Sequence, residues 1–309
     1  MEKEPVIEIR NLVKDYGHGR GVFGVSFTVY KGECFGFLGP NGAGKSTTIR
    51  HLMGFSRPKS GETLICGLNS MKYRTEVLQS VGYLPGEVAL PLNLTGKDVY
   101  KIQLKLKNVK DTSFAEYLIK YFEVDLNLLC KNMSLGMKRK MAILCAFLND
   151  PDILVLDEPS SGLDPEMQIK FINFILEEKK RGKTILLSSH IFSEVDETCD
   201  RISIIKDGEI VSTFIANDLE QNKNEKYEIH FDSDDDYLTF ISRLGYDINL
   251  VSTTRKERKI VVSANDDDIS DLLFALKGLN VIDFNEIKVT LEEYFMSFYK
   301  EDRVYKGVK

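Results

Sequence analysis

Residues 39–46, Gly-Pro-Asn-Gly-Ala-Gly-Lys-Ser, have the types and the spacing of a loop that binds phosphate groups. They follow the short apolar run 34–38 and precede a helical pattern that starts near Thr47. A strand, a glycine-rich turn and the start of a helix form the context in which such a P-loop binds a nucleotide. We therefore predict a nucleotide site made by Gly39, Pro40, Asn41, Gly42, Ala43, Gly44, Lys45, Ser46 and Thr47.

The residue types within this loop predict separate tasks. We expect Gly39, Gly42 and Gly44 to take backbone dihedrals that a side chain would forbid, so that successive N–H groups turn toward phosphate oxygens. The N-terminus of the following helix adds positive potential at the same point. Lys45 supplies a mobile positive charge for the outer phosphates, and the Ser46 hydroxyl supplies a hard oxygen ligand for Mg²⁺.

A second motif is the apolar run 153–156 followed by Asp157 and Glu158. A buried strand that ends in a carboxylate would deliver Asp157 to the shell of a magnesium ion, by way of water. Glu158, one residue further, can polarise a water for in-line attack on a γ-phosphate. Because this pair follows a P-loop in the same chain, it points to ATP hydrolysis.

His190 stands just past the end of the next apolar run, 184–187. A polar side chain that leaves a buried strand beside a phosphate site can contact the γ-phosphate or orient the attacking water. A lone histidine is also commonly a structural residue, and the sequence leaves this alternative open.

These motifs stand in one order along the chain, and over about residues 6–217 the sequence resembles an ATP-binding subunit of an ABC transporter. The loop 161–164, Ser-Gly-Leu-Asp, belongs to the same ordered set. Tyr16 stands where this family stacks an aromatic ring on adenine, although a lone loop aromatic is as often a packing residue. Residues 133–137, Met-Ser-Leu-Gly-Met, occupy the place of the family signature, which usually reads Leu-Ser-Gly-Gly-Gln.

The resemblance implies that ATP and Mg²⁺ are the ligands, and that two subunits close head to tail around them. Ser134 and Gly136 would face the nucleotide held by the second subunit, while Ser161 and Asp164 would belong to a loop at the dimer contact. A serine at a helix N-terminus suits this task, because it presents a hydroxyl and free amides to a γ-phosphate. Closure around ATP and reopening after hydrolysis would then move integral-membrane permease subunits.

Two departures from the family pattern bear on function. The signature has Leu135 for its first glycine and Met137 for its glutamine, and the run 137–141 is more like drug, bacteriocin or lipid exporters of the short ABC-2-like subgroup. The family also has a glutamine soon after the strand near residues 81–84, which touches magnesium and senses the membrane subunit. Glu87 is the nearest polar residue here, and a carboxylate can ligate magnesium.

Composition limits the remaining possibilities. A chain of 309 residues is too long for one ordinary core, so two domains are expected. The 41 basic and 47 acidic side chains give a net charge of −6, which argues against a nucleic-acid partner. No stretch approaches 18 apolar residues, no signal peptide is evident, and the five scattered cysteines favour reduced thiols. We expect a cytoplasmic protein, peripheral on the inner face of the cell membrane.

The order of patterns predicts an α/β P-loop domain over 1–220, with a helical subdomain at about 95–150. A polar linker, 221–226, precedes a smaller α+β domain, 227–309. Its βαββαβ order is that of a ferredoxin-like fold. The acidic runs 232–236 and 266–268 each precede a helix, so we interpret them as helix-capping residues rather than metal ligands.

The leading hypothesis is an ATPase that powers an exporter. Two alternatives stay open from the sequence: an importer ATPase whose C-terminal domain senses a ligand, and a soluble ABC-type ATPase that acts in DNA repair, ribosome function or cluster assembly.

Overall fold

A computed structural model describes residues 3–216, 225–244, 248–264, 269–287 and 290–300. The chain divides into two compact units, Met1–Ala216 and Asn217–Lys309. The predicted linker 221–226 overlaps strand β11, which begins at Glu225, and its first four residues lie outside the described ranges.

The first unit is built on a six-stranded sheet with the strand order β10-β9-β3-β8-β7-β6. Its neighbours pair in parallel, except that β10 runs antiparallel to β9. Every residue of β3, β7 and β8 is buried, which explains why these strands are continuous apolar runs in the sequence. The strands are β3 (Cys34–Leu38), β6 (Val81–Leu84), β7 (Ile153–Asp157), β8 (Thr184–Ser189), β9 (Arg201–Lys206) and β10 (Glu209–Ile215).

A second, antiparallel sheet of the same unit has the order β2-β1-β4-β5. Its strands are β1 (Pro5–Asp15), β2 (Gly21–Tyr30), β4 (Ser60–Ile65) and β5 (Leu68–Asn69). A core cluster joins it to the central sheet, with the ring of Phe27 5.0 Å from Phe35 and 5.1 Å from Phe37 between centroids. Helix α1 (Lys45–Leu52) packs on the same core and carries the end of the P-loop.

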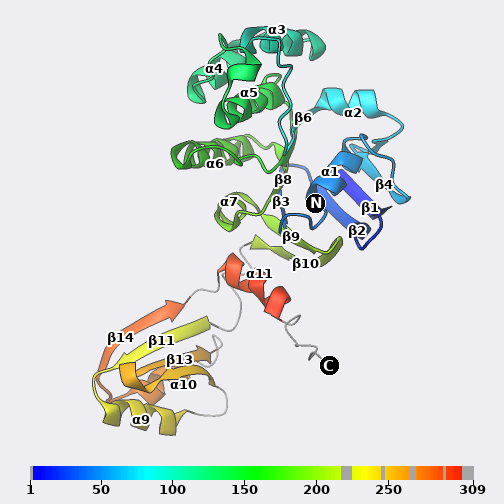
Figure 1. The fold of residues 1–309 in the computed structure, drawn as a ribbon. Coiled ribbons are helices and arrows are strands. Elements are labelled where there is room, and N and C mark those ends of the chain that lie inside the picture. Colours follow the sequence, from blue (N-terminus) through cyan, green and yellow to red (C-terminus); the bar gives the residue numbers. More distant parts are fainter. Residues whose placement is uncertain (1–2, 217–224, 245–247, 265–268, 288–289, 301–309) are drawn as a thin grey trace, which may run out of the picture. The chain divides into compact units, whose positions relative to one another are not determined.

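Helices α3 (Gly96–Leu106), α4 (Ser113–Tyr121) and α5 (Leu135–Phe147) lie together in the green part of Figure 1, within the predicted helical region 95–150. The Thr95 hydroxyl accepts a hydrogen bond from the Asp98 N–H, and the Asp98 carboxylate accepts one from the Thr95 N–H, so a capping box starts α3. The unit also contains α2 (Arg74–Ser80), η1 (Cys130–Asn132), α6 (Pro165–Lys180) and α7 (Phe192–Thr198).

The second unit contains a four-stranded antiparallel sheet with the order β12-β13-β11-β14. Tyr227, Ile229 and Phe231 alternate toward its core, as their spacing in the sequence predicts. The elements are β11 (Glu225–Phe231), α9 (Asp234–Arg243), β12 (Asn249–Thr254), η2 (Arg255–Glu257), β13 (Lys259–Ala264), α10 (Ile269–Leu276), β14 (Val281–Ile287) and α11 (Leu291–Lys300).

The acidic run 232–236 belongs to a helix start, as predicted. The Ser233 hydroxyl accepts a hydrogen bond from the Asp236 N–H, and three aspartates occupy the first turn of α9. The second acidic run, 266–268, lies outside the described residues. Among the residues that the structure describes, no group of three or more His, Cys, Asp or Glu side chains is placed to hold a metal ion, and no helix is long and apolar enough to cross a bilayer.

Candidate functional site

The P-loop connects the end of β3 to α1, as its sequence context predicts. Gly42 and Gly44 have φ angles of 86° and 114°, a region that residues with side chains rarely adopt. The prediction of a special dihedral is wrong for Gly39, which is not among the residues with a positive φ. A glycine is needed there for space, because a Cβ would lie 2.5 Å from the Ile205 carbonyl oxygen.

Lys45 is held in place by its own chain. Its side chain is only 5% exposed, and its Nζ donates to the carbonyl oxygens of Gly39 at 2.5 Å and Pro40 at 3.2 Å. The same Nζ forms an ion pair with Oε1 of Glu158 at 2.9 Å. A nearly buried ammonium needs such partners, because an unpaired charge in this environment would be costly.

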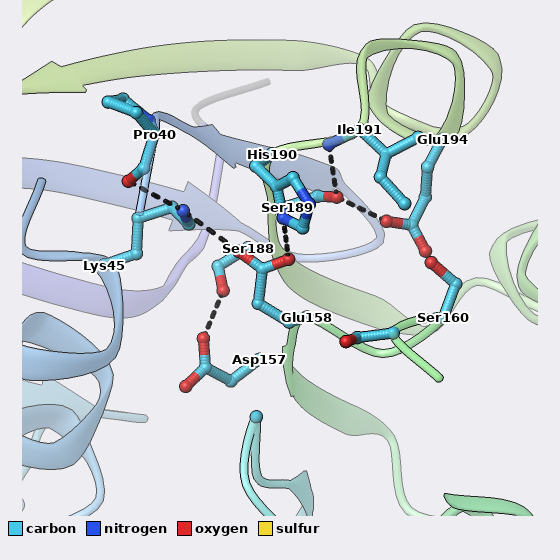
Figure 2. Close-up of polar contacts among 12 residues, drawn as sticks. Pro40, Lys45, Asp157, Glu158, Ser160, Ser188, Ser189, His190, Ile191 and Glu194 are labelled. Atoms are coloured by element: carbon cyan, nitrogen blue, oxygen red, sulfur yellow. Dashed lines mark hydrogen bonds and ion pairs between the residues drawn. The ribbon is translucent and has the colours of Figure 1, made fainter. Parts of the chain in front are cut away.

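Glu158 lies between Lys45 and His190, as Figure 2 shows. Its Oε2 is 2.5 Å from Nδ1 of His190. Glu158 follows β7 directly and has a φ of 49°, while its N–H donates to the Ser188 carbonyl at 2.9 Å. A left-handed conformation at a residue that is not glycine is a strained arrangement typical of functional sites. Here it occurs at the residue that follows the buried strand.

Asp157 is buried and occupies the last position of β7, opposite Ser188 of β8. Its Oδ1 accepts a hydrogen bond from the Ser188 hydroxyl at 2.5 Å. Because β3, β8 and β7 are parallel neighbours, their carboxyl ends meet at one edge of the sheet. The strand order therefore places Asp157, Glu158 and His190 beside the P-loop.

These side chains share one cavity of about 700 Å³, which Ser46, Glu87, Asp157, Glu158 and His190 help to line. Glu87, predicted as the nearest polar residue after β6, is thus brought to the same cavity as Ser46 and Asp157. The cavity contains hydroxyl and carboxylate oxygens, which are the ligands that Mg²⁺ prefers. The donor set therefore suits that ion.

Tyr16, Ser134 and Gly136, which were also predicted from the sequence, are not among the residues that line this cavity. The Tyr16 side chain is 54% exposed, and the Lys14 Nζ lies 5.4 Å from the centre of its ring. Ser134 is exposed and caps α5, accepting a hydrogen bond from the Met137 N–H at 3.2 Å. Gly136 is partly buried against the loop 161–164, of which Ser161 also lines the cavity.

Asp164 also has a structural task, which its predicted place at the dimer contact does not include. Its Oδ1 accepts a hydrogen bond from the Met167 N–H at 3.0 Å, so the side chain caps the N-terminus of α6. The acidic residue followed by proline at the first helical position is the signal that predicts such a cap.

Sequence reasoning missed three charged residues at or beside the site. Arg50 lines the cavity from α1. Arg139 is 2% exposed and contacts the loops around the site. Glu194 is 1% exposed and accepts a hydrogen bond from the Ser189 hydroxyl at 2.5 Å, next to His190. Burial raises the pKa of Glu194. Arginine and glutamate are common on surfaces, so the burial of Arg139 and Glu194 could not be inferred from one sequence.

Comparisons with known proteins agree with this geometry. Residues 22–161 match the model of the family described as ABC transporter. The bacitracin transport ATP-binding protein BcrA of Bacillus licheniformis is 32% identical over 296 residues, which cover 94% of this chain and 96% of that protein. The Nod factor export ATP-binding protein I of Burkholderia lata is 35% identical over 207 residues, 65% of this chain and 68% of that protein.

Solved structures show the same fold. An ATP-binding subunit of an ABC transporter matches with a TM-score of 0.64 and 29% identity, over 70% of this chain and 92% of that chain. A dimeric ATP-binding cassette in a post-hydrolysis state with ADP and Pi matches with a TM-score of 0.61 and 23% identity, over 68% of this chain and 98% of that chain.

The chain belongs to the ATP-binding proteins of ABC transporters. It is an ATPase, and the ATP hydrolysis of this family serves transport. The resemblance predicted from the motifs is thereby confirmed.

Proposed function

We propose that this chain powers an exporter by acting on a separately encoded membrane permease, from the inner face of the cell membrane. The names of two relatives, a bacitracin transport protein and a Nod factor export protein, support the direction of transport. The observation that carries the catalytic part is the position of Glu158 between Lys45 and His190, beside Ser46 and Asp157.

Glu158 is the proposed general base. When ATP binds, a phosphate oxygen replaces Oε1 of Glu158 at Lys45, because one nearly buried ammonium has few positions for acceptors. The freed carboxylate then holds a water together with His190. Glu158 takes a proton from this water as its oxygen attacks the γ-phosphorus in line, and ADP leaves with the electrons of the broken bond.

Ser46 and Asp157 would hold Mg²⁺, with Glu87 at the third oxygen-bearing position of the cavity. When bound, the ion neutralises charge on the β- and γ-phosphates. The Ser188 hydroxyl orients the Asp157 carboxylate by its hydrogen bond. Amide groups of the P-loop hold the phosphates, and we keep Tyr16 as the residue that would stack on adenine.

A second copy of the chain is the proposed partner at Ser134 and Gly136. Among the described residues that line the cavity, neither of these two occurs. Ser134 nevertheless exposes a hydroxyl at a helix N-terminus, a place suited to a phosphate. A nucleotide bound to a second copy of the chain would supply this phosphate. Ser161 and the rest of loop 161–164 would then lie at the contact between the two copies.

The permease contact is proposed at an apolar cavity of about 690 Å³ beside the site, lined in part by α2, α3 and the segment after β6. Tyr83, Pro85 and Ala89 line both this cavity and the one that contains Glu158. Leu94 and Ile102 contribute to its apolar surface. A helix of the permease seated here would therefore touch residues that also border the ATP site.

The domain division 1–220 and 227–309 is part of the proposal, with a ferredoxin-like fold for the smaller domain. The element order β11-α9-β12-β13-α10-β14 and the sheet order β12-β13-β11-β14 support this assignment.

ATP turnover of the purified chain tests the proposed base. We expect Glu158→Gln to lower kcat by roughly a hundredfold or more, the range of a lost general base, while ATP binding persists. Tyr16→Ala is measured beside it as a binding variant, expected to raise KM with little change in kcat. Turnover that is unaltered by Glu158→Gln would refute the assignment.

A further inference from the structure

Arg139 is a charged residue buried inside the helical region. It lies in the second turn of α5, the helix that Ser134 caps, and its side chain is 2% exposed. The lysines on either side of it, Lys138 and Lys140, are only partly buried. Burial lowers the pKa of Arg139, while the charges of Asp157 and Glu158 oppose that effect. A guanidinium remains charged under these conditions, so its hydrogen bonds must compensate for lost water.

All three hydrogen bonds of its guanidinium go to backbone carbonyls of two loops at the ATP site. Nε donates to the Ser161 carbonyl at 2.9 Å. Nη1 donates to the Pro85 carbonyl at 2.8 Å, and Nη2 to the Gly86 carbonyl at 2.6 Å. Because the guanidinium is planar and its donors point in fixed directions, these bonds restrict both loops at once.

Two close contacts show how the joined segments pack on the site and on each other. A Cβ on Gly86 would lie 3.0 Å from Oδ2 of Asp157, so this turn packs directly on the carboxylate that is proposed to hold Mg²⁺. A Cβ on Gly136 would lie 3.1 Å from the Gly162 carbonyl oxygen, so the N-terminus of α5 packs on the loop 161–164. Glu87 follows Gly86 in the chain and lines the ATP cavity.

We propose that Arg139 is a positioning residue that ties the helix of Ser134 to the turn at Pro85–Gly86 and to the loop that begins at Ser161. This inference rests on the proposed function. There, the helix of Ser134 binds the nucleotide of the second copy, the turn at Pro85–Gly86 lies beside the Mg²⁺ ligands and the permease contact, and the loop that begins at Ser161 lies at the dimer contact. Arg139 touches none of the reacting atoms. Its effect is to make the three segments move together when the site closes.

The test uses the full chain with Arg139→Gln, Arg139→Lys and Lys140→Gln. The glutamine removes the fork of donors, and the lysine keeps the charge with a single donor group. Lys140→Gln removes a charge from the next position of the same helix and serves as the matched control. Three quantities are measured: ATP affinity with a fluorescent nucleotide, kcat, and amide hydrogen exchange of peptides spanning 39–46, 85–87 and 158–164.

We expect Arg139→Gln to bind ATP within about twofold of the unaltered chain and to lose at least about tenfold in kcat, because the P-loop is untouched. Exchange should rise together in peptides 85–87 and 158–164 and stay unchanged in 39–46. Arg139→Lys should recover part of kcat, and Lys140→Gln should match the unaltered chain in all three measurements.

Two results would overturn the inference. The first is a kcat of Arg139→Gln within about twofold of the unaltered chain. The second is a parallel loss of ATP affinity, kcat and exchange protection in all peptides, because a residue that only stabilises the fold would give that result. If Arg139→Gln does not fold, unaltered kcat and exchange in Arg139→Lys overturn it instead. The exchange readout needs no turnover, so a failure of the proposed base at Glu158 is seen separately, in the variant of that residue alone.

Discussion

The two sides of the proposed ATP site differ in how they are held within one chain. On the P-loop side, Lys45 is nearly buried and its partners, two carbonyls and Glu158, come from the same chain. On the signature side, Ser134 is exposed, and the bond from the Met137 N–H only caps its own helix. The first arrangement is complete in a single chain, whereas the second offers polar groups to something outside it.

This difference has a physical reason. A buried charge must be paired where the chain folds, so the P-loop side is assembled with the core. An exposed helix N-terminus can leave its amides to water until an anion arrives. Binding of ATP and closure on a partner can therefore be separate events, and variants on the two sides should behave differently.

Complementation between variants gives the largest expected effect. Lys45→Ala and Ser134→Ala should each be nearly inactive alone, because each removes one side of every site. When they are mixed in equal amounts, the mixed dimer has one complete site. We expect about a quarter of the unaltered turnover to return, since half of the dimers are mixed and each has one working site of two.

A matched control mixes Lys45→Ala with Glu158→Gln. Both changes lie on the P-loop side, so no mixed dimer contains a complete site and turnover should stay low. Recovery in this control, or none in the first mixture, would contradict the head-to-tail arrangement.

Two variants of Asp164 distinguish its role as the cap of α6 from a direct role at the dimer contact. Asparagine is as good a helix cap as aspartate, so Asp164→Asn should leave the free energy of unfolding nearly unchanged, whereas Asp164→Ala should lower it by about 1 kcal/mol. Chemical denaturation of both variants provides the measurement. If only the cap matters, Asp164→Asn also keeps full turnover; lost turnover with intact stability would favour a direct contact at the dimer.

A variant of Glu194, the buried carboxylate beside His190, gives the smallest expected effect and tests the P-loop side of the site. Burial raises the pKa of this carboxyl, so its contribution to stability is present below its ordinary pKa of 4.5 and is lost as the pH rises through the raised value. Glu194→Gln cannot ionise. We therefore expect its urea midpoint, relative to that of the unaltered chain, to increase from pH 4.5 toward neutral pH.

Urea unfolding at several pH values, with Glu197→Gln on the same helix as an exposed control, would check this. A midpoint difference that is constant over the pH range would mean that Glu194 stays in one protonation state throughout.

The sequence by itself determined the local parts of the protein. Neighbouring residues specify the P-loop and the apolar strands that end at Asp157 and before His190. They also specify the helix starts at Thr95 and Ser134. Their backbone preferences and hydrogen bonds extend over only a few positions, so they can be inferred in order along the chain. The same patterns predicted the element order of the smaller C-terminal unit.

Only the tertiary structure decided which distant side chains meet and which charges are buried. The order β3-β8-β7 brings His190 to Glu158 and Glu158 to Lys45, pairs that are far apart in the sequence. The close packing of Gly39 on Ile205 and the burial of Arg139 depend on the same long-range contacts. Such contacts arise from sheet order and packing between elements, and no local preference of a single residue specifies them.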